Sequence, residues 1–314
     1  MRQVLSCLLL FCTLITSVRA NDKVVFTPQW IAQAQFAGYY VALYKGFYNQ
    51  QHLDVTILYP STSSSSLQKF TDNQCQFATF QLLAAYEHRQ KGLNLVNILQ
   101  TSQSSMQCIV SHHPVKSPKD LAGKKFGGWL SGYNQLGHIM NDIYGLHLQW
   151  IPFISSVNLF NIGAIDATMA QTYNEYFQIL STGEKLGPEN VLRMADIGLD
   201  VPEDGLYVKA EYYRKHPDIV RRFRKASRDG WIWAYRHPNE ALDIVMQVVH
   251  KNKIRTNRTA QKWMLQKILR SLRNSKTGMV DTNLHPSSVD FVNRLFRKVN
   301  KTNKAISYQE LTRP

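Results

Sequence analysis

Cysteine is scarce in this sequence of 314 residues, which contains only four. Two of them fall in the first twenty residues, leaving Cys75 and Cys108 for the rest of the chain. Both lie in apolar, strand-like runs, so two alternatives stay open: one disulfide in an oxidising compartment, or two buried thiols. No cysteine or histidine cluster has metal-ligand spacing, because His112 and His113 are adjacent and would point to opposite faces of a strand. We therefore expect no metal site and no cofactor.

Long apolar runs are also missing after the N-terminus. There, Arg2 is followed by a mostly apolar stretch at 4–15 and by the small residue Ala20. This pattern is typical of a cleaved signal peptide over residues 1–20, and the apolar stretch is too short for a stable bilayer anchor. We expect the mature chain to be exported to the periplasm as a soluble monomer.

Acidic residues are few. The sequence has 22 Asp and Glu against 37 Lys and Arg, for a formal net charge of +15. Such a balance can indicate nucleic acid or an anionic surface as a partner, but an exported protein meets little nucleic acid. The most basic segment, 209–228, places its charges at helical spacings around apolar residues, which is typical of a solvated helix face. We expect no nucleic-acid partner.

Short strand-like runs alternate with helical patterns through the first two thirds of the chain. The first unit combines a strand at 23–26, a polar and aromatic loop at 30–35, a helix at 36–47 with apolar side chains on about one face, and a strand at 55–57. This alternation predicts an α/β fold with mainly parallel sheets. Further strands are expected at 76–80, 95–99, 108–110, 125–129, 149–153, 164–170 and 206–208, with a helix starting at 171 and a turn at 203–205.

The last third is predominantly helical. Helices are expected at 210–215, 217–235, 238–249, 259–272 and 286–298, several of them starting at a proline, which suits only the first helical turn. We expect this segment to return and pack onto the first βα series. The result would be two α/β lobes, residues 21–110 with 200–314 and residues 111–199, with a small-molecule site in the cleft between them.

Five motifs occur in an order that resembles one family of binding proteins. They are QAQFAGYYVA at 33–42, KGFY with LDV at 45–48 and 53–55, KSPKDLAGKK at 116–125, AIDA with YNEY at 164–167 and 173–176, and Gly-Trp at 230–231. Together they cover about residues 24–311 and resemble the SsuA/NrtA-type solute-binding proteins and their thiamine-pyrimidine relatives. The resemblance implies a type II periplasmic binding protein fold, whose lobes close on a ligand, and an inner-membrane ABC permease as partner.

The aromatic first loop and the Tyr-Asn-Glu element resemble the thiamine-pyrimidine branch most, which implies an aminopyrimidine ligand. Aromatic side chains would stack on the flat face of such a ring, unless they only pack the core. Asn174 and Glu175 would pair with its amino and ring nitrogens, and glutamines, Gln103 among them, would bind its other polar groups. The predicted ligand-binding residues are Trp30, Gln33, Gln35, Tyr39, Gln81, Trp129, Tyr133, Asn174 and Glu175.

Two further functions remain as alternatives. Fungal thiamine-pyrimidine synthases resemble these binding proteins but use a lysine for pyridoxal phosphate, a histidine in the next helix and a cysteine-rich iron motif. The matching positions, near Phe80, Ala84 and 199–207, hold none of these residues, so we expect a binding protein without catalytic residues. A ligand-sensing input module is the other alternative, although the chain as given has no membrane-spanning helix through which to signal.

Overall fold

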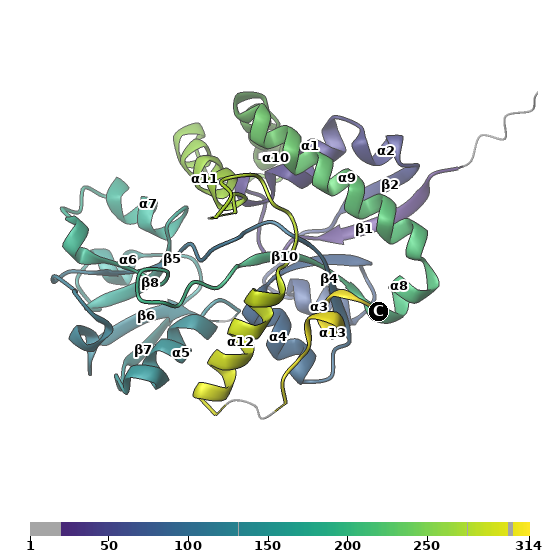
Figure 1. The fold of residues 1–314 in the computed structure, drawn as a ribbon. Helices are drawn as coiled ribbons and strands as arrows, with labels where there is room; N and C mark the ends of the chain where they lie inside the picture. Colours follow the sequence, from purple (N-terminus) through teal and green to yellow (C-terminus); the bar gives the residue numbers. More distant parts are fainter. Residues whose placement is uncertain (1–19, 131, 275, 301–303) are drawn as a thin grey trace, which may run out of the picture.

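Two five-stranded β-sheets, each flanked by helices, form the protein (Figure 1). The computed structural model describes residues 20–130, 132–274, 276–300 and 304–314, so residues 1–19 of the predicted signal peptide lie outside the described residues. We call the first sheet with its helices lobe 1, on the right of Figure 1, and the second sheet with its helices lobe 2, on the left.

The first sheet consists of β1 (Asp22–Thr27), β2 (Leu53–Ile57), β3 (Phe77–Gln81), β4 (Leu95–Gln100) and β10 (Asp204–Lys209). Its strand order is β2-β1-β3-β10-β4. β1 is parallel to β2 and β3, whereas β10 is antiparallel to both of its neighbours, β3 and β4. β10 therefore follows lobe 2 in the sequence but belongs to the sheet of lobe 1, where it lies between β3 and β4.

The second sheet consists of β5 (Gln107–Ser111), β6 (Lys125–Trp129), β7 (Gln149–Phe153), β8 (Ala167–Gln171) and β9 (Val191–Arg193), in the order β7-β6-β8-β5-β9. β6 is parallel to β7 and β8, and β5 is antiparallel to β8 and β9. Each sheet is mixed but mainly parallel in direction: four of its five strands run the same way, and the strand that follows a crossing between the lobes, β10 or β5, runs the other way. β5 also lies in the second sheet, although the predicted boundary at 110 assigned most of it to lobe 1.

The helices of the C-terminal part follow the predicted pattern closely. The predicted bounds of α8 and α12 are confirmed, and those of α9, α10 and α11 differ from the structure by at most two residues at either end. The helices are α1 (Ala37–Tyr44), α2 (Phe47–Gln50), α3 (Ser66–Thr71), α4 (Leu82–Gln90), α5 (Gln135–Tyr144), α6 (Asn158–Asn161), α7 (Glu175–Ser181), α8 (Ala210–Lys215), α9 (Pro217–Arg236), α10 (Pro238–Lys251), α11 (Arg258–Ser271), α12 (Pro286–Lys298) and α13 (Tyr308–Thr312).

Helix α1 is shorter and more deeply buried than predicted. The predicted helix at 36–47 is divided into a 3-10 turn at Ala34–Phe36, α1, and α2, with Gly46 at a φ of 75° between the two α-helices. Residues 37–42 are buried on all sides of the helix instead of on one face. The reason is that the first sheet, α9 and α10 surround this part of α1, and only its last residue, Tyr44, is exposed.

Two large apolar cores hold the lobes. The first lies on one face of the first sheet, where Phe26 and Phe77 pack under α1, α9, α10 and α11. The second begins on the opposite face, with Phe80, and continues without interruption into lobe 2 through Met140 of α5 and Val292 of α12. Figure 1 shows α12 beside α5, so the helical return segment packs against lobe 2 as well as lobe 1.

The structure also shows the state of the two cysteines, and whether the described residues include a membrane-spanning helix or a group of metal ligands. Cys75 and Cys108 are buried free thiols. None of the helices in the described part of the chain has the length and apolarity that a membrane crossing requires. Within the same residues, no group of three or more His, Cys, Asp or Glu side chains is arranged to hold a metal ion.

We predict that Gly230→Ala destabilises the protein, because α1 and α9 cross in contact at this residue. A Cβ atom at Gly230 would lie 2.2 Å from the carbonyl oxygen of Gly38 and 2.8 Å from the Cβ atom of Ala42. Overpacking of this kind costs about 1–3 kcal/mol in the free energy of unfolding, which urea denaturation would measure.

Gly137→Ala in α5 is the matched control. There the nearest atoms are 3.0 Å and 3.2 Å away and belong to the side chains of Trp150 and Met169, so we expect a smaller loss. Equal stability of Gly230→Ala and the wild type would contradict the close helix contact.

Candidate functional site

A small cavity lies between the lobes, at the loops that follow their strands. One wall is the loop after β1, and the other is formed by the end of β6, the loop after it and the segment that follows β8. Its volume is about 20 Å³, room for about one water molecule, so the two walls are nearly in contact. This is where ligands bind in open α/β sheets. The lining residues are Trp30, Gln33, Gln35, Trp129, Tyr133, Gln171, Tyr173, Asn174 and Glu175.

All but two of the nine sequence-predicted residues line this cavity. The exceptions are Tyr39 and Gln81. Tyr39 belongs to the first core, with its ring centroid 4.6 Å from that of Phe26 and 5.6 Å from that of Trp231. Its ring therefore packs in the core, outside the lining of the cavity. Gln81 is buried at the end of β3, where its side-chain oxygen accepts a 3.4 Å hydrogen bond from Nε2 of Gln107.

Two lining residues, Gln171 and Tyr173, were not predicted. Gln171 is the last residue of β8 and is 2 % exposed, and neither its amide nitrogen nor its amide oxygen has a hydrogen-bond partner among the described residues. A buried amide without partners is costly, so a ligand that donates and accepts here would recover the lost hydrogen bonds. Gln171 ends the strand that precedes the Tyr-Asn-Glu element, and its place at a strand end is the sequence signal that points to it.

Aromatic rings fill much of the space between the walls. Trp30 of lobe 1 meets Tyr133 of lobe 2 edge to face, with centroids 5.6 Å apart and planes at 88°. Tyr133 also lies 5.8 Å from Trp129 at 53°, and its hydroxyl donates a 3.3 Å hydrogen bond to the carbonyl oxygen of Gln29 across the cleft. Because neither ring pair is parallel, a flat ligand needs a ring rotation or a small lobe opening before it can stack.

The carboxylate of Glu175 is held in place from three directions. Its Oε1 accepts hydrogen bonds from Trp129 Nε1 at 3.3 Å and from Asn174 Nδ2 at 2.9 Å, and its Oε2 accepts one from the backbone N–H of Gln171 at 3.0 Å. Burial raises the pKa of Glu175 above its ordinary value, and these donors oppose the rise. The helix predicted to start at 171 starts at Glu175, which puts this carboxylate in the first turn of α7, where the helix dipole favours it.

On the lobe 1 side, glutamine side chains are oriented by Asp204. Its Oδ1 accepts from Gln29 Nε2 at 2.6 Å and its Oδ2 from Gln35 Nε2 at 2.7 Å, while Gln35 Oε1 accepts from Gln33 Nε2 at 2.7 Å. Sequence placed Asp204 in a turn. The structure corrects this: it is the first residue of β10, 4 % exposed, and it fixes which end of each amide faces the cavity.

Glu203 is buried beside Asp204, where the chain returns from lobe 2. Its Oε1 accepts from the backbone N–H groups of Met106 at 2.6 Å and Gln107 at 3.0 Å and from the hydroxyl of Ser105 at 2.9 Å. Its Oε2 has no partner among the described residues. Burial, together with the charge of Asp204, raises the pKa of Glu203 to about 8, and burial raises the pKa of Asp204 to about 6.

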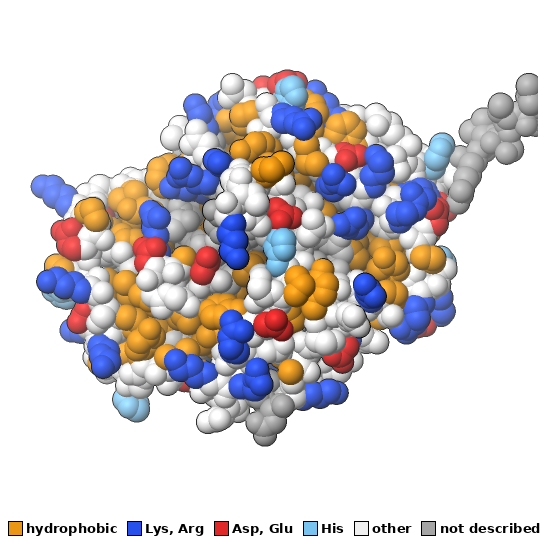
Figure 2. All heavy atoms as spheres, viewed as in Figure 1, with side chains coloured by type: hydrophobic (Ala, Val, Ile, Leu, Met, Phe, Trp, Pro, Cys, Tyr) orange, Lys and Arg blue, Asp and Glu red, His pale blue; other side chains and the backbone are white. Residues whose placement is uncertain are grey.

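The interior of the site is therefore electronegative in a protein of net charge +15. The carboxylates of Glu175 and Asp204 lie in or directly behind the cavity, and no Lys or Arg is among its lining residues. Figure 2 shows Lys and Arg side chains scattered over this face of both lobes. Such a site favours neutral ligands rich in N–H donors, or cations, and it disfavours anions because nothing in the lining would compensate their charge.

Comparison with known proteins assigns the chain to a family. The family model described as "NMT1/THI5 like" matches residues 33–241, which hold every lining residue of the cavity except Trp30, and all of α9. The chain belongs to the NMT1/THI5 like family. The family resemblance predicted from the sequence motifs is thereby confirmed.

Two curated proteins are similar to this NMT1/THI5 like chain along most of its length. A riboflavin-binding protein, RibY of Chloroflexus aurantiacus, is 24% identical over 268 residues, or 82% of this chain and 74% of that protein. A formylaminopyrimidine-binding protein of Halalkalibacterium halodurans is 21% identical over 245 residues, or 74% of this chain and 73% of that protein.

Solved structures share the fold of this NMT1/THI5 like protein. The zinc-bound ligand-binding component of an ABC-type import system from Staphylococcus aureus superimposes with a TM-score of 0.66 at 13% identity, covering 94% of this chain and 97% of that chain. The protein therefore has the type II periplasmic binding protein fold, as the resemblance implied.

The buried Glu203 predicts a decline of stability with rising pH. Its pKa in the folded protein, about 8, lies above the ordinary value of 4.5, so between these pH values the folded protein holds a proton that the unfolded chain has released. The stabilisation is complete below about pH 4.5 and is lost as pH rises to about 8.

Glu203→Gln should remove most of this dependence, because an amide keeps an acceptor for the same three donors and never ionises. We expect the variant to exceed the wild type by at least about 1 kcal/mol at pH 8 and to match it near pH 4.5, measured by urea denaturation. Asp54→Asn, at an exposed position of β2, is the control. Parallel pH profiles of Glu203→Gln and the wild type would contradict a proton held at Glu203.

Proposed function

We propose that this protein is the solute-binding component of an ABC-type importer in the periplasm and that it captures a small, flat heteroaromatic, a thiamine-pyrimidine precursor. The observation that carries the proposal is the interlobe cavity, which combines four aromatic rings and four side-chain amides with a fixed carboxylate and has no cation in its lining. The fold supports the transport role, because the similar Staphylococcus aureus structure is described as the ligand-binding component of an ABC-type import system.

An aminopyrimidine matches this arrangement group by group. Its amino group would donate to Glu175, whose oxygens are already aimed by Trp129 and the Gln171 backbone. The free amide of Gln171 supplies both a donor and an acceptor for the ring nitrogens and a substituent. Trp30 or Tyr133 would cover the ring face after rotating out of their edge-to-face contact.

Anionic ligands of related binding proteins, such as sulfonates, fit poorly. A sulfonate needs N–H donors backed by positive charge, and the lining offers a carboxylate in their place. A flavin is the competing neutral ligand, since RibY is the relative with the higher identity. Its three fused rings need more room than a single ring, so the cavity, whose volume is about 20 Å³, must widen further for a flavin than for a pyrimidine.

Ligand entry requires the lobes to separate. The chain crosses between the sheets twice, at 101–106 and at 194–203, and these two segments are the natural hinge. In the closed form the lobes are held by the Tyr133 to Gln29 hydrogen bond and by the apolar core that α4 and α12 share with α5. A ligand would add contacts from both walls and shift the lobes toward closure.

The first test is a calorimetric titration of the mature protein with hydroxymethylpyrimidine, formylaminopyrimidine, thiamine, riboflavin, taurine and nitrate. We expect saturable binding of the aminopyrimidines and none of taurine or nitrate, because the lining holds no cation to compensate an anion. Preference for riboflavin would replace the pyrimidine assignment by a flavin. Tight binding of taurine would overturn the electrostatic argument altogether.

The second test concerns Glu175. Glu175→Gln should weaken aminopyrimidine binding by about 1.5–3 kcal/mol, the value of a hydrogen bond to a charged group, because the neutral amide replaces the carboxylate acceptor. Glu189→Gln, at an exposed position of lobe 2, removes the same charge and should leave the affinity unchanged. Unchanged affinity of the Glu175 variant, with retained folding by circular dichroism, would assign Glu175 to a structural role.

A further inference from the structure

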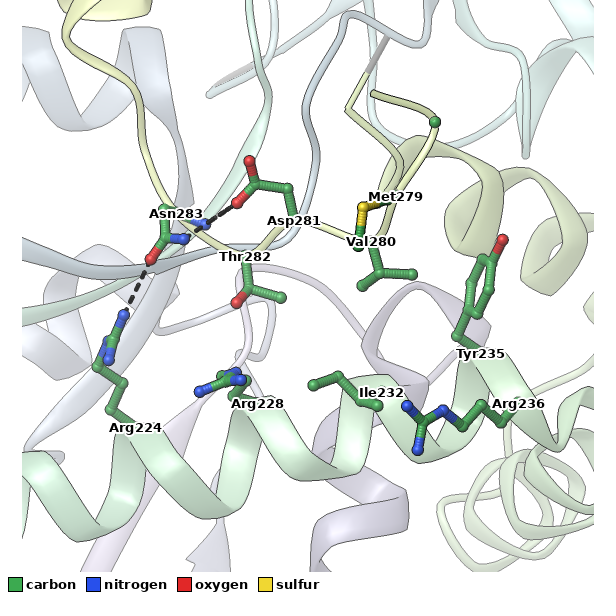
Figure 3. A pocket seen from close by; sticks show the side chains of 11 residues that line it. Arg224, Arg228, Ile232, Tyr235, Arg236, Met279, Val280, Asp281, Thr282 and Asn283 are labelled. Atoms are coloured by element: carbon green, nitrogen blue, oxygen red, sulfur yellow. Dashed lines mark hydrogen bonds between the residues drawn. The ribbon is translucent and has the colours of Figure 1, made fainter. Parts of the chain in front are cut away.

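A second, larger hollow lies on the outside of lobe 1, behind the hinge. It is a groove of about 530 Å³ between helix α9 and the segment 278–283, within the size range of small-molecule sites. Figure 3 shows α9 as one wall and this segment as the other. None of the residues of the interlobe cavity lines it, so the two sites are separate.

The wall formed by α9 is strongly basic. Arg224, Arg228 and Arg236 line the groove at intervals of one or two helical turns, with Ile232 on the same face. Asp281 is the one carboxylate in the lining. Its oxygens already accept hydrogen bonds from Asn274, Asn283 and His285, so it does not pair with an arginine.

The other cations of α9 have partners, which makes the groove residues different from an ordinary solvated face. Arg221 and Arg222 pair with Asp218, and Lys225 pairs with Asp229. These are the only two acidic residues of the helix. For Arg228 and Arg236, by contrast, the described residues provide neither a hydrogen bond nor an ion pair. Arg228 is exposed, as the sequence-based interpretation of 209–228 as a solvated helix face predicts.

The two ends of the groove differ in chemistry. Figure 3 shows Arg224 and Arg228 at one end, beside Asn283 and Thr282. Arg224 is fixed there, because its Nη2 donates to Asn283 Oδ1 at 3.1 Å and its Nε donates to the carbonyl oxygen of Ile98 at 2.6 Å.

Apolar and aromatic side chains form the rest of the groove. Ile232, Val280 and Met279 lie in its middle, and Tyr235 and Arg236 are at its far end (Figure 3). One end therefore suits a tetrahedral anion, for which guanidinium groups have matching geometry, and the middle suits an apolar body.

The wall opposite α9 is held in place before any ligand arrives. Its Thr282 carbonyl oxygen accepts from the backbone N–H of Gln100 at 3.0 Å, and the N–H of Asp281 donates to Leu272 at 2.8 Å. Gln103, predicted from sequence as a ligand contact, instead donates its side-chain amide to the carbonyl oxygens of Asp281 at 3.1 Å and Asn283 at 3.3 Å. A wall tied to the interlobe crossing in this way is preorganised, which lowers the entropic cost of binding.

We propose that this groove is a binding site for a small organic phosphate. The phosphate lies between Arg224 and Arg228, and the apolar body of the ligand runs along Ile232 and Val280 toward Tyr235. The ligand neutralises guanidinium groups that otherwise repel one another on one helix face, which supplies part of the binding free energy.

The test uses phenyl phosphate as the probe, titrated calorimetrically into the mature protein at low salt. Saturable binding is expected, and phenol, which lacks the phosphate, should not bind. Arg228→Gln should weaken phenyl phosphate roughly tenfold or more, the loss expected for one charge-assisted contact. Arg221→Gln is the control, because it removes the same charge from the same helix outside the groove, and it should stay within about twofold of the wild type, since distant surface charges are screened.

Three further measurements separate this site from its alternatives. Glu175→Gln should bind phenyl phosphate as the wild type does, because the interlobe cavity is not involved. Equal losses in Arg221→Gln and Arg228→Gln would mean a diffuse electrostatic effect and would overturn the site. Binding to phosphatidylglycerol vesicles without binding to phenyl phosphate would identify a membrane-contact surface instead, and would equally overturn the proposal, as would no binding of phenyl phosphate at all.

Discussion

Two buried carboxylates, Glu203 and Asp204, stand next to each other where the chain returns from lobe 2 into the first sheet. Burial of two adjacent acids without a cation is expensive, and the surrounding structure is arranged to reduce that cost. Asp204 is surrounded by glutamine donors from the first loop, and Glu203 by backbone donors from the other crossing between the lobes. Through these hydrogen bonds the two carboxylates connect the first sheet with the segment that crosses between the lobes and with the loop that forms the lobe 1 wall of the cavity.

This arrangement links the protonation states of Glu203 and Asp204 to the orientation of the glutamine side chains of lobe 1. Glu203, with a pKa of about 8, is largely neutral at pH 7, whereas Asp204, with a pKa of about 6, is largely ionised. An ionised Asp204 keeps the amide nitrogens of Gln29 and Gln35 turned inward and so leaves amide oxygens to face other groups, as Gln35 does toward Gln33. The donor and acceptor pattern that lobe 1 offers to a ligand is therefore set from behind the site.

How far the sequence predicts this structure depends on how local each feature is. The helix bounds of the last third follow from prolines at the first helical position, a steric effect within a few residues. The strand at Asp204 and Gly205 does not follow from local sequence, because an Asp-Gly pair is typical of turns and becomes extended here only between β3 and β4. Tyr39 likewise belongs to the core because α9 and α10 enclose α1, which no pattern within α1 reveals.

The residues that line the candidate site were easier to predict than the hydrogen bonds that hold them in place. Polar and aromatic residues at or just after strand ends gather at the cleft in an open α/β sheet, which is why Trp30, Trp129 and Glu175, selected with the help of the family resemblance, line one cavity. The roles of Gln171, Asp204 and Glu203 depend on which partners the fold provides or withholds, and sequence position contains no such information.

The apolar core shared between the lobes limits how the protein can respond to its ligand. In a two-lobed binding protein, a ligand acts by stabilising the closed form relative to the open one, and the shift is limited by its differential affinity for the two forms. Here α4 and α12 already pack on α5, and Tyr133 already reaches Gln29 across the cleft. Opening must expose part of that core, so closure is favoured even before the ligand contributes. A small ligand with few contacts is then sufficient to hold the closed form.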